Sequence, residues 1–310
     1  MLYILIPLCL LILLLLCASL YAFLRGSTRR DRTELFRAST VVPSGRYKYR
    51  DEMQKGVDWF EAQPKTELHI KSYDGLSLTA EVIEANDPVG LIVAAHGFRS
   101  WPSREFALIA KHLYEQGYTV LYPYMRAHRK SEGKYITFGV KERRDIAAWA
   151  KLLSEKRPDL PLFLYGQSMG GASVIMASGL DLPSQTRGVI ADSAFHSPQD
   201  VIATALVNAY KLPVFPMLPA MDMWARIIAG YSLTATTCKE ALDKTSLPFL
   251  FIHGTKDELV PYDMGLQNYT QCHTQKEMLT VEGAAHCASY YADPVRYISY
   301  LDGFLKKYGK

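Results

Sequence analysis

A serine flanked by glycines, placed directly between an apolar strand and an apolar helix, constrains the fold of this chain more than any other feature. The pentapeptide Gly166-Gln167-Ser168-Met169-Gly170 joins the strand-like segment Leu162–Gly166 to the helix-like segment Met169–Ser178. A turn this tight strains the backbone of its central residue, and only small neighbours leave room for it. The pattern therefore predicts a serine at the end of a buried strand, beside a helix N-terminus that favours negative charge.

Short apolar segments alternate with amphipathic ones on both sides of that serine. The segments that predict strands are Gly90–Ala95, Tyr118–Pro123, Leu162–Gly166, Gly188–Asp192, Pro248–His253 and Glu277–Glu282. The segments that predict helices are Phe106–Gln116, Lys141–Ser154, Met169–Ser178 and, approximately, Ile298–Lys306. Such alternation is typical of an α/β fold, with a mostly parallel sheet covered by helices on both faces. Ahead of it, Tyr73-Asp74-Gly75 between two alternating segments, Glu67–Ser72 and Leu76–Glu84, predicts an antiparallel hairpin.

The N-terminal segment predicts a membrane anchor. Residues 1–24 contain no charged side chain, and as a helix residues 2–24 would be roughly 35 Å long, enough to cross a hydrocarbon core of about 30 Å. A cleaved secretory signal is the alternative, but no basic residue precedes the apolar run and the run is longer than such signals require. We therefore expect a single-pass transmembrane helix over residues 1–24 that contacts the lipid bilayer through residues 2–24.

The charge of the chain is concentrated just after this segment. Between Arg25 and Phe60 there are nine basic and five acidic side chains, which accounts for the whole net charge of +4. The excess therefore indicates no nucleic-acid-binding surface, and the positive flank predicts that the large domain lies on the cytoplasmic face. We expect a basic juxtamembrane spacer over residues 25–64, with a break at Pro43-Ser44-Gly45 and a lead-in helix around Asp51–Glu61, followed by the main domain over residues 65–310.

Serine is a poor nucleophile unless a base removes its proton, and that base needs an orienting acid. In the order expected of this architecture, the acid and then a histidine follow the serine on loops after late strands. Asp257 and His286 satisfy that order, so the candidate catalytic residues are Ser168, Asp257 and His286. The oxyanion formed on attack needs two amide donors, for which we expect the N–H groups of Met169 and of Phe98. His96, in the same loop as Phe98, is expected to be structural.

Five motifs together resemble the α/β-hydrolase-fold serine hydrolases. They are HGF at 96–98, GQSMGG at 166–171, ADSAFHSP at 191–198, FIHGTKDELVP at 251–261 and GAAH at 283–286. The resemblance extends from about residue 65 to 308. The chain is especially similar to membrane-anchored bacterial members described as esterases, peptidases or cinnamoyl-ester-hydrolase-like proteins. It implies the α/β-hydrolase fold and a Ser-acid-His triad. Some relatives take the acid from the end of the preceding strand, which leaves Asp192 as an alternative to Asp257.

The sequence departs from that family's pattern after the strand Tyr118–Pro123. The family usually has D-x-R-G-x-G-x-S-x-G there, whereas this chain has Tyr124 in place of the acid and Arg129 in place of a glycine. Because this loop mainly braces the rim of the site, we expect an altered loop geometry with the triad retained.

Residues 193–245 interrupt the alternation and are expected to form a cap over the nucleophile. Their apolar and methionine-rich composition favours an acyl ester or thioester as the small-molecule substrate. A serine peptidase or amidase on the same fold is the alternative function. A catalytically inert binding protein with this fold is a third hypothesis. No metal or organic cofactor is needed for this chemistry, and an odd number of cysteines without a C-x-x-C pair suggests neither a disulfide framework nor a zinc site.

Overall fold

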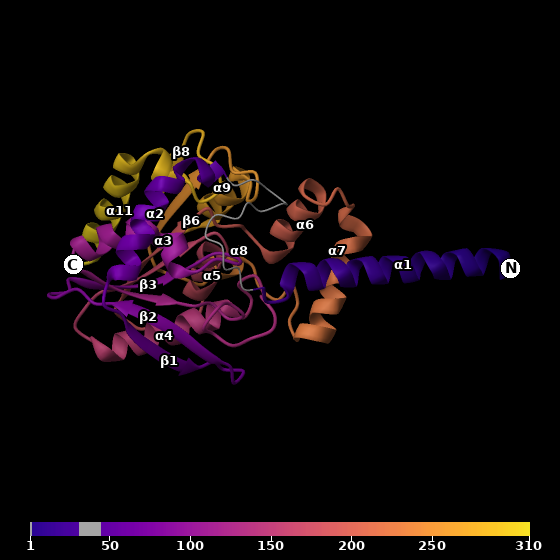
Figure 1. Ribbon diagram of the computed structural model, residues 1–310, viewed down its shortest axis with the longest axis horizontal. Helices are drawn as coiled ribbons and strands as arrows, with labels where there is room; N and C mark the ends of the chain where they lie inside the picture. Colours follow the sequence, from indigo (N-terminus) through magenta and orange to yellow (C-terminus); the bar gives the residue numbers. More distant parts are fainter. Residues whose placement is uncertain (1, 31–44) are drawn as a thin grey trace.

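The computed structural model describes residues 2–30 and 45–310, and its centre is one eight-stranded sheet (Figure 1). The strands are β1 (Thr66–Lys71), β2 (Ser77–Ile83), β3 (Gly90–Ala95), β4 (Tyr118–Pro123), β5 (Leu162–Gln167), β6 (Thr186–Asp192), β7 (Phe249–Gly254) and β8 (Lys276–Val281). Their order is β1-β2-β4-β3-β5-β6-β7-β8. β1 pairs antiparallel with β2, β2 pairs antiparallel with β4, and every later pairing is parallel. The predicted leading hairpin and mostly parallel sheet are confirmed.

Helices cover both faces of the sheet, and a separate apolar core lies under each layer. One face is covered by α2 (Arg50–Ala62), α3 (Pro102–Glu115) and α11 (Pro294–Tyr308). The other is covered by α4 (Glu142–Lys156), α5 (Met169–Ser178), α8 (Cys238–Leu242) and α9 (Tyr262–Gln271). Two short helices, η1 (Gly45–Tyr49) and α10 (Ser289–Ala292), lie in connections. Most of the strands are buried on both faces, which explains why their sequences are almost continuously apolar.

The strand predictions are accurate to within two residues, whereas some helices differ. α3 begins at Pro102 and α11 at Pro294, each about four residues before the apolar periodicity begins. Both prolines occupy the first helical turn, where the missing N–H costs nothing. α9 was not expected, since Gly265 interrupts a polar segment. The glycine is required because a Cβ there would lie 2.2 Å from Nδ1 of His253.

The N-terminal helix α1 (Leu2–Ser27) extends three residues beyond its predicted end and projects away from the sheet (Figure 1). Within the described residues it is the one helix long and apolar enough to cross a membrane. Its inner end is attached to the main domain, because the N–H of Ile136 donates to Ser27 O at 2.7 Å and that of Arg29 donates to Lys134 O at 2.8 Å. The start of the predicted spacer is therefore paired with the loop after β4, while the predicted break at Pro43-Ser44 lies outside the described residues.

The predicted cap segment contains three elements that share an apolar cluster with α1, and the middle one packs directly against α1. They are α6 (Pro198–Asn208), α7 (Val214–Trp224) and the π-helical turn η2 (Ala225–Ala229). Together with Phe23 of α1 and residues before and after these elements, their buried side chains form a third apolar cluster, the cap cluster. Its members are Phe23, Val140, Ile202, Leu206, Met217, Met221, Ala225, Tyr231 and Leu233. α8, in the same segment, packs instead into the main core against α5. The cap cluster thus joins the insertion to the N-terminal helix rather than to the sheet alone.

Candidate active site

Ser168 lies at the turn between β5 and α5, as the glycine pattern predicts. Its backbone is in the left-handed half of conformational space, at φ 56° and ψ −120°. The glycines on either side are required by close approach, because a Cβ on Gly170 would lie 1.9 Å from Ala95 O and one on Gly166 would lie 2.2 Å from Gly170 O. Strand β3, the turn and the first residues of α5 therefore fit together only without side chains at these positions.

The structure brings Ser168, His286 and Asp257 together at the carboxyl edge of the sheet. Nε2 of His286 lies 2.8 Å from Oγ of Ser168, and Nδ1 of the same ring lies 2.7 Å from Oδ2 of Asp257. All three side chains are buried to a similar degree, with exposed fractions between 6 and 9%. This is the hydrogen-bond chain that nucleophile, base and orienting acid need.

Asp257 is held in its charged form. Its Oδ1 accepts hydrogen bonds from the backbone N–H groups of Leu259, at 3.0 Å, and Val260, at 2.8 Å. Burial alone would raise the pKa of Asp257, but the positive charge of His286 and hydrogen bonds from His253 and His286 lower it below its usual value. The carboxylate is therefore available as an acceptor for the imidazole.

Asp192, the alternative acid, is not part of the hydrogen-bonded series Ser168–His286–Asp257. Its carboxylate accepts from the hydroxyls of Tyr297 and Ser193, both at 2.9 Å. Complete burial raises its pKa to about 6. Oγ of Ser193 in turn accepts from the N–H of Cys287 at 3.1 Å, so Asp192 supports the loop that carries His286. The geometry favours Asp257 as the partner of the imidazole.

His253 is a second histidine in contact with Asp257. Its Nε2 lies 2.9 Å from Val260 O and 3.3 Å from Oδ2 of Asp257, and the ring is 1% exposed. The ring therefore ties the end of β7 to the loop that holds Asp257. One sequence feature could have indicated this contact with Asp257: His253 stands at a strand end, four residues before that aspartate.

The loop after β3, which carries Phe98, lies against Ser168. A Cβ on Gly97 would be 3.1 Å from Cβ of Ser168. Within the described part of the chain, the backbone N–H groups of Phe98 and Met169 have no hydrogen-bond acceptor. Their role as oxyanion donors stays a prediction.

Two histidines join this loop to the loop after β4 by reciprocal hydrogen bonds. The N–H of Met125 donates to Nε2 of His96 at 3.0 Å, and the N–H of Arg99 donates to Nε2 of His128 at 2.9 Å. Since both Nε2 atoms accept, the proton of each ring lies on Nδ1, which donates to a backbone carbonyl. Burial, reinforced by His128, lowers the pKa of His96 to about 3, so this ring is neutral at physiological pH. His96 thus has the structural position expected of it.

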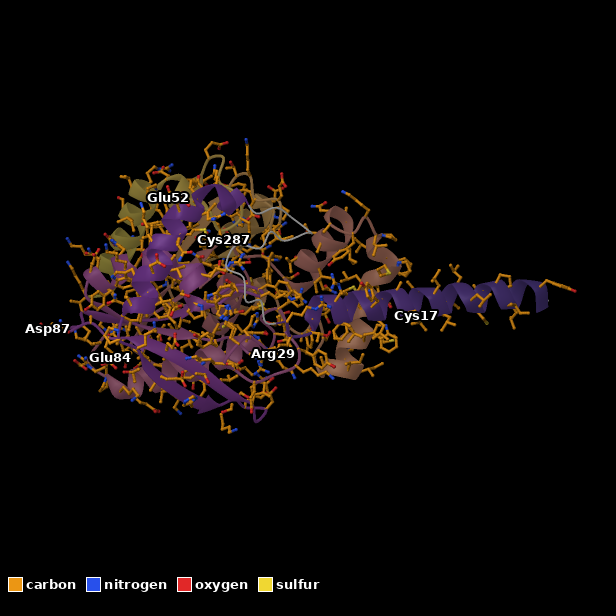
Figure 2. All side chains as sticks on the ribbon, in the orientation of Figure 1. Cys17, Arg29, Glu52, Glu84, Asp87 and Cys287 are labelled. Atoms are coloured by element: carbon orange, nitrogen blue, oxygen red, sulfur yellow. The ribbon has the colours of Figure 1, made fainter. Side chains whose placement is uncertain are left out.

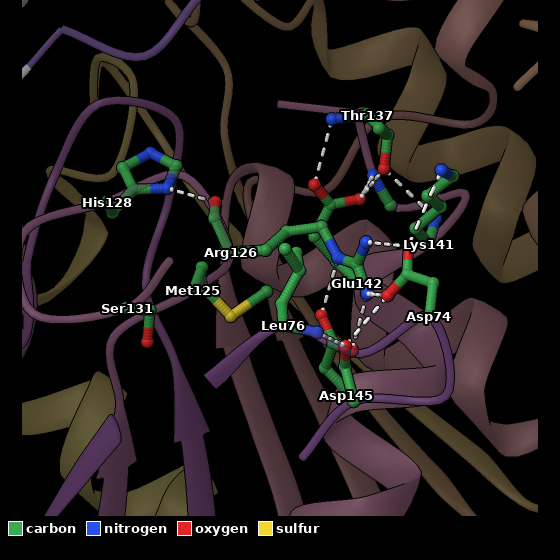
Figure 3. Close-up of polar contacts among 12 residues, drawn as sticks. Asp74, Leu76, Met125, Arg126, His128, Ser131, Thr137, Lys141, Glu142 and Asp145 are labelled. Carbon is green, nitrogen blue, oxygen red and sulfur yellow. Dashed lines mark hydrogen bonds and ion pairs between the residues drawn. The ribbon is translucent and has the colours of Figure 1, made fainter. Parts of the chain in front are cut away.

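Arg126, in the loop after β4, ties that loop to two other elements (Figure 3). Its guanidinium, 1% exposed, pairs with both oxygens of Asp145 on α4, at 2.6 and 2.7 Å, and with Asp74 in the β1–β2 turn, at 2.9 and 3.2 Å. Burial alone would lower the pKa of Arg126, but these two carboxylates raise it above its usual value. Nearby, Glu142 accepts from the N–H groups of Thr137 and Gly139, both at 2.8 Å. The altered loop is therefore anchored to two other elements.

Arg129, which replaces a family glycine, has contacts of its own. Its guanidinium lies over the ring of Trp101, 3.7 Å from the ring centre, and its backbone adopts φ 41°. Its carbonyl accepts a hydrogen bond from Arg29, so the departure from the family pattern connects this loop to the end of α1. Among the described residues, no group of three or more His, Cys, Asp or Glu side chains is arranged to hold a metal ion.

Solved structures with similar folds agree with this architecture. An esterase from Pyrococcus furiosus, Pf2001, superposes with a TM-score of 0.64 at 22% identity, over 80% of this chain and 93% of its own. Est1E from Butyrivibrio proteoclasticus, solved with ferulic acid bound, superposes with a TM-score of 0.58 at 20% identity, over 78% of this chain and all of its own. The chain is an α/β-hydrolase-fold protein.

The sequence is also similar to that of known proteins. Residues 86–224 match the family described as serine aminopeptidase, S33. An uncharacterized protein of Bacillus subtilis, YqkD, is 27% identical over 79% of this chain and 81% of its own length. The chain is thus S33-like in sequence, and esterases are among its structural relatives.

Proposed function

We propose that this protein is a serine hydrolase that cleaves carboxylic esters or thioesters through an acyl-enzyme. The observation that carries the proposal is the pair of hydrogen bonds made by His286, to Ser168 at 2.8 Å and to Asp257 at 2.7 Å. Esterases among the structural relatives support this choice of reaction.

In the proposed reaction Oγ of Ser168 attacks the substrate carbonyl while Nε2 of His286 takes the hydroxyl proton. The amides of Phe98 and Met169 hold the resulting oxyanion. Collapse of the tetrahedral intermediate breaks the bond to the alcohol or thiol, which leaves with the proton from His286. A water molecule, deprotonated by the same imidazole, then attacks the acyl-enzyme, and release of the carboxylic acid restores Ser168. Throughout, Asp257 orients the ring and stabilises its charged form.

We also propose that α1 is retained as a membrane anchor, with the catalytic domain on the cytoplasmic face. Three observations favour retention over cleavage as a signal sequence. Phe23 is 1% exposed within the cap cluster, Oγ of Ser19 accepts from the indole N–H of Trp224 at 3.1 Å, and Arg99 donates to the carbonyl of Arg25 at 2.5 Å. Removal of α1 would expose the apolar surface that it covers.

The reaction is tested by hydrolysis of p-nitrophenyl esters of graded acyl length, compared with aminoacyl-anilides, by the full-length chain in detergent. We expect ester turnover that exceeds anilide turnover at least tenfold and that disappears in Ser168→Ala. The S33 family's description makes amide cleavage the second candidate, and faster turnover of the anilides would select it. Ester turnover unchanged by Ser168→Ala would contradict both, and no turnover of either series would favour an inert binding protein.

A further inference from the structure

The freely projecting part of α1 is too short to cross a bilayer by itself. Every side chain from Leu5 to Leu14 is exposed, whereas Leu15 begins to pack against the cap cluster. At 1.5 Å per residue, residues 2–14 extend about 20 Å, and a hydrocarbon core is about 30 Å thick. The missing length of about 10 Å has to come from residues 15 to 21, which the cap helices flank.

The cap therefore lies at the depth where the anchor is still within the membrane. Ser19 marks that depth, because its hydroxyl is hydrogen-bonded to Trp224 of α7. Figures 1 and 2 show α6 and α7 alongside the inner part of α1, with Cys17 near the outer edge of the cap.

The outward surface of the cap is suited to a leaflet. Phe215 is 79% exposed and Ile227 67%, and three further exposed side chains of the same elements and their connection are apolar or aromatic, namely Val207, Tyr210 and Val214. Between Asp200 and Asp222 the only charged residue is Lys211. Next to Ile227, Arg226 is 59% exposed and pairs with Asp222. Exposed apolar side chains with few charges among them are typical of surfaces that enter a membrane.

The same cluster reaches the candidate active site. The ring of Phe138 stacks on the ring of Phe98 at 5.5 Å and packs against the cap cluster. Ser168 is only 8% exposed, so its surroundings offer little open access from water. A substrate that arrives from the membrane side meets the cap first.

We propose that the cap is immersed in the cytoplasmic leaflet and that the substrate is a long-chain acyl ester or thioester resident in that leaflet. The anchor helix and the exposed cap side chains Phe215 and Ile227 then form one continuous lipid-contacting surface. The substrate half of this proposal rests on the proposed function, whereas the immersion of the cap does not.

Immersion is tested with an environment-sensitive fluorophore attached to single cysteines in the full-length chain in lipid nanodiscs. Cys9 and Cys17 are first replaced by alanine, and the remaining cysteines are buried. Phe215→Cys and Ile227→Cys are compared with Val295→Cys on α11, which is 78% exposed and outside the cap. We expect lipids spin-labelled near the headgroup to quench positions 215 and 227 at least threefold more than position 295, and aqueous iodide to show the reverse. Equal iodide quenching at all three positions would overturn immersion.

Substrate delivery is tested with the double variant Phe215→Ser/Ile227→Ser and the matched control Val295→Ser. The double variant should hydrolyse a long-chain ester embedded in vesicles at least fivefold more slowly and a dissolved short-chain ester at an unchanged rate. An unchanged rate on the embedded ester, or an equal loss on both esters, would overturn delivery from the leaflet. Covalent labelling of Ser168 by a fluorophosphonate in the same samples reports the proposed function separately, so the two failures are distinguishable.

Discussion

Asp257→Asn is expected to lower kcat for ester hydrolysis by about 10⁴, the size of loss seen when the orienting acid of a serine triad becomes an amide. The amide cannot accept the Nδ1–H of His286 in the way that the carboxylate does at 2.7 Å. The imidazole then favours the tautomer whose Nε2 carries a proton and cannot take another from Ser168. Initial rates with a short-chain p-nitrophenyl ester, at matched protein concentrations, measure the loss.

The control for this prediction is Asp192→Asn. Asp192 bonds Tyr297 and Ser193 and has no hydrogen bond to His286, so its replacement should change kcat less than tenfold in protein that remains folded by circular dichroism. If Asp192→Asn abolished turnover while Asp257→Asn retained it, the assignment of the acid would be reversed.

Arg126→Met is expected to lower the free energy of unfolding by about 3–5 kcal/mol, the usual cost of removing one partner from a buried ion pair. The substitution leaves Asp145, which is 3% exposed, without the guanidinium that holds both its oxygens. The urea midpoint of the full-length chain in mild detergent measures the change.

Two further variants distinguish loss of the ion pair from general disruption of the loop as the cause of lower stability. Lys151→Ala removes an exposed lysine of the same helix as Asp145 and should cost less than about 0.5 kcal/mol. Arg126→Met/Asp145→Leu removes both charges and should regain most of the lost stability. A loss below about 1 kcal/mol in Arg126→Met would show that the pair is not a major support of this loop.

Much of the fold could be predicted because its strands are buried on both faces and their apolar runs are bounded by turns. The positions of Ser168, Asp257 and His286 followed from the same pattern, since parallel strands place the residues after their carboxyl ends at one edge of the sheet. These residues do lie together, although their catalytic roles remain proposals.

What could not be predicted depends on contacts between distant segments. Helix α9 has no clear periodicity, and its Gly265 is explained only by the ring of His253. The reciprocal bonds of His96 and His128 require two loops to be known at once. Likewise, the apolar pattern of α1 indicates a membrane helix in any context, and only the structure shows Phe23 buried in the cap cluster.

The most direct measurement is peptide mapping by mass spectrometry after the folded full-length chain has reacted with a fluorophosphonate. A phosphonylated Ser168, with no adduct in Ser168→Ala or after denaturation before reaction, is the predicted result. An unmodified Ser168 in folded protein, or an adduct that forms equally well once residue 168 is alanine, would contradict the account.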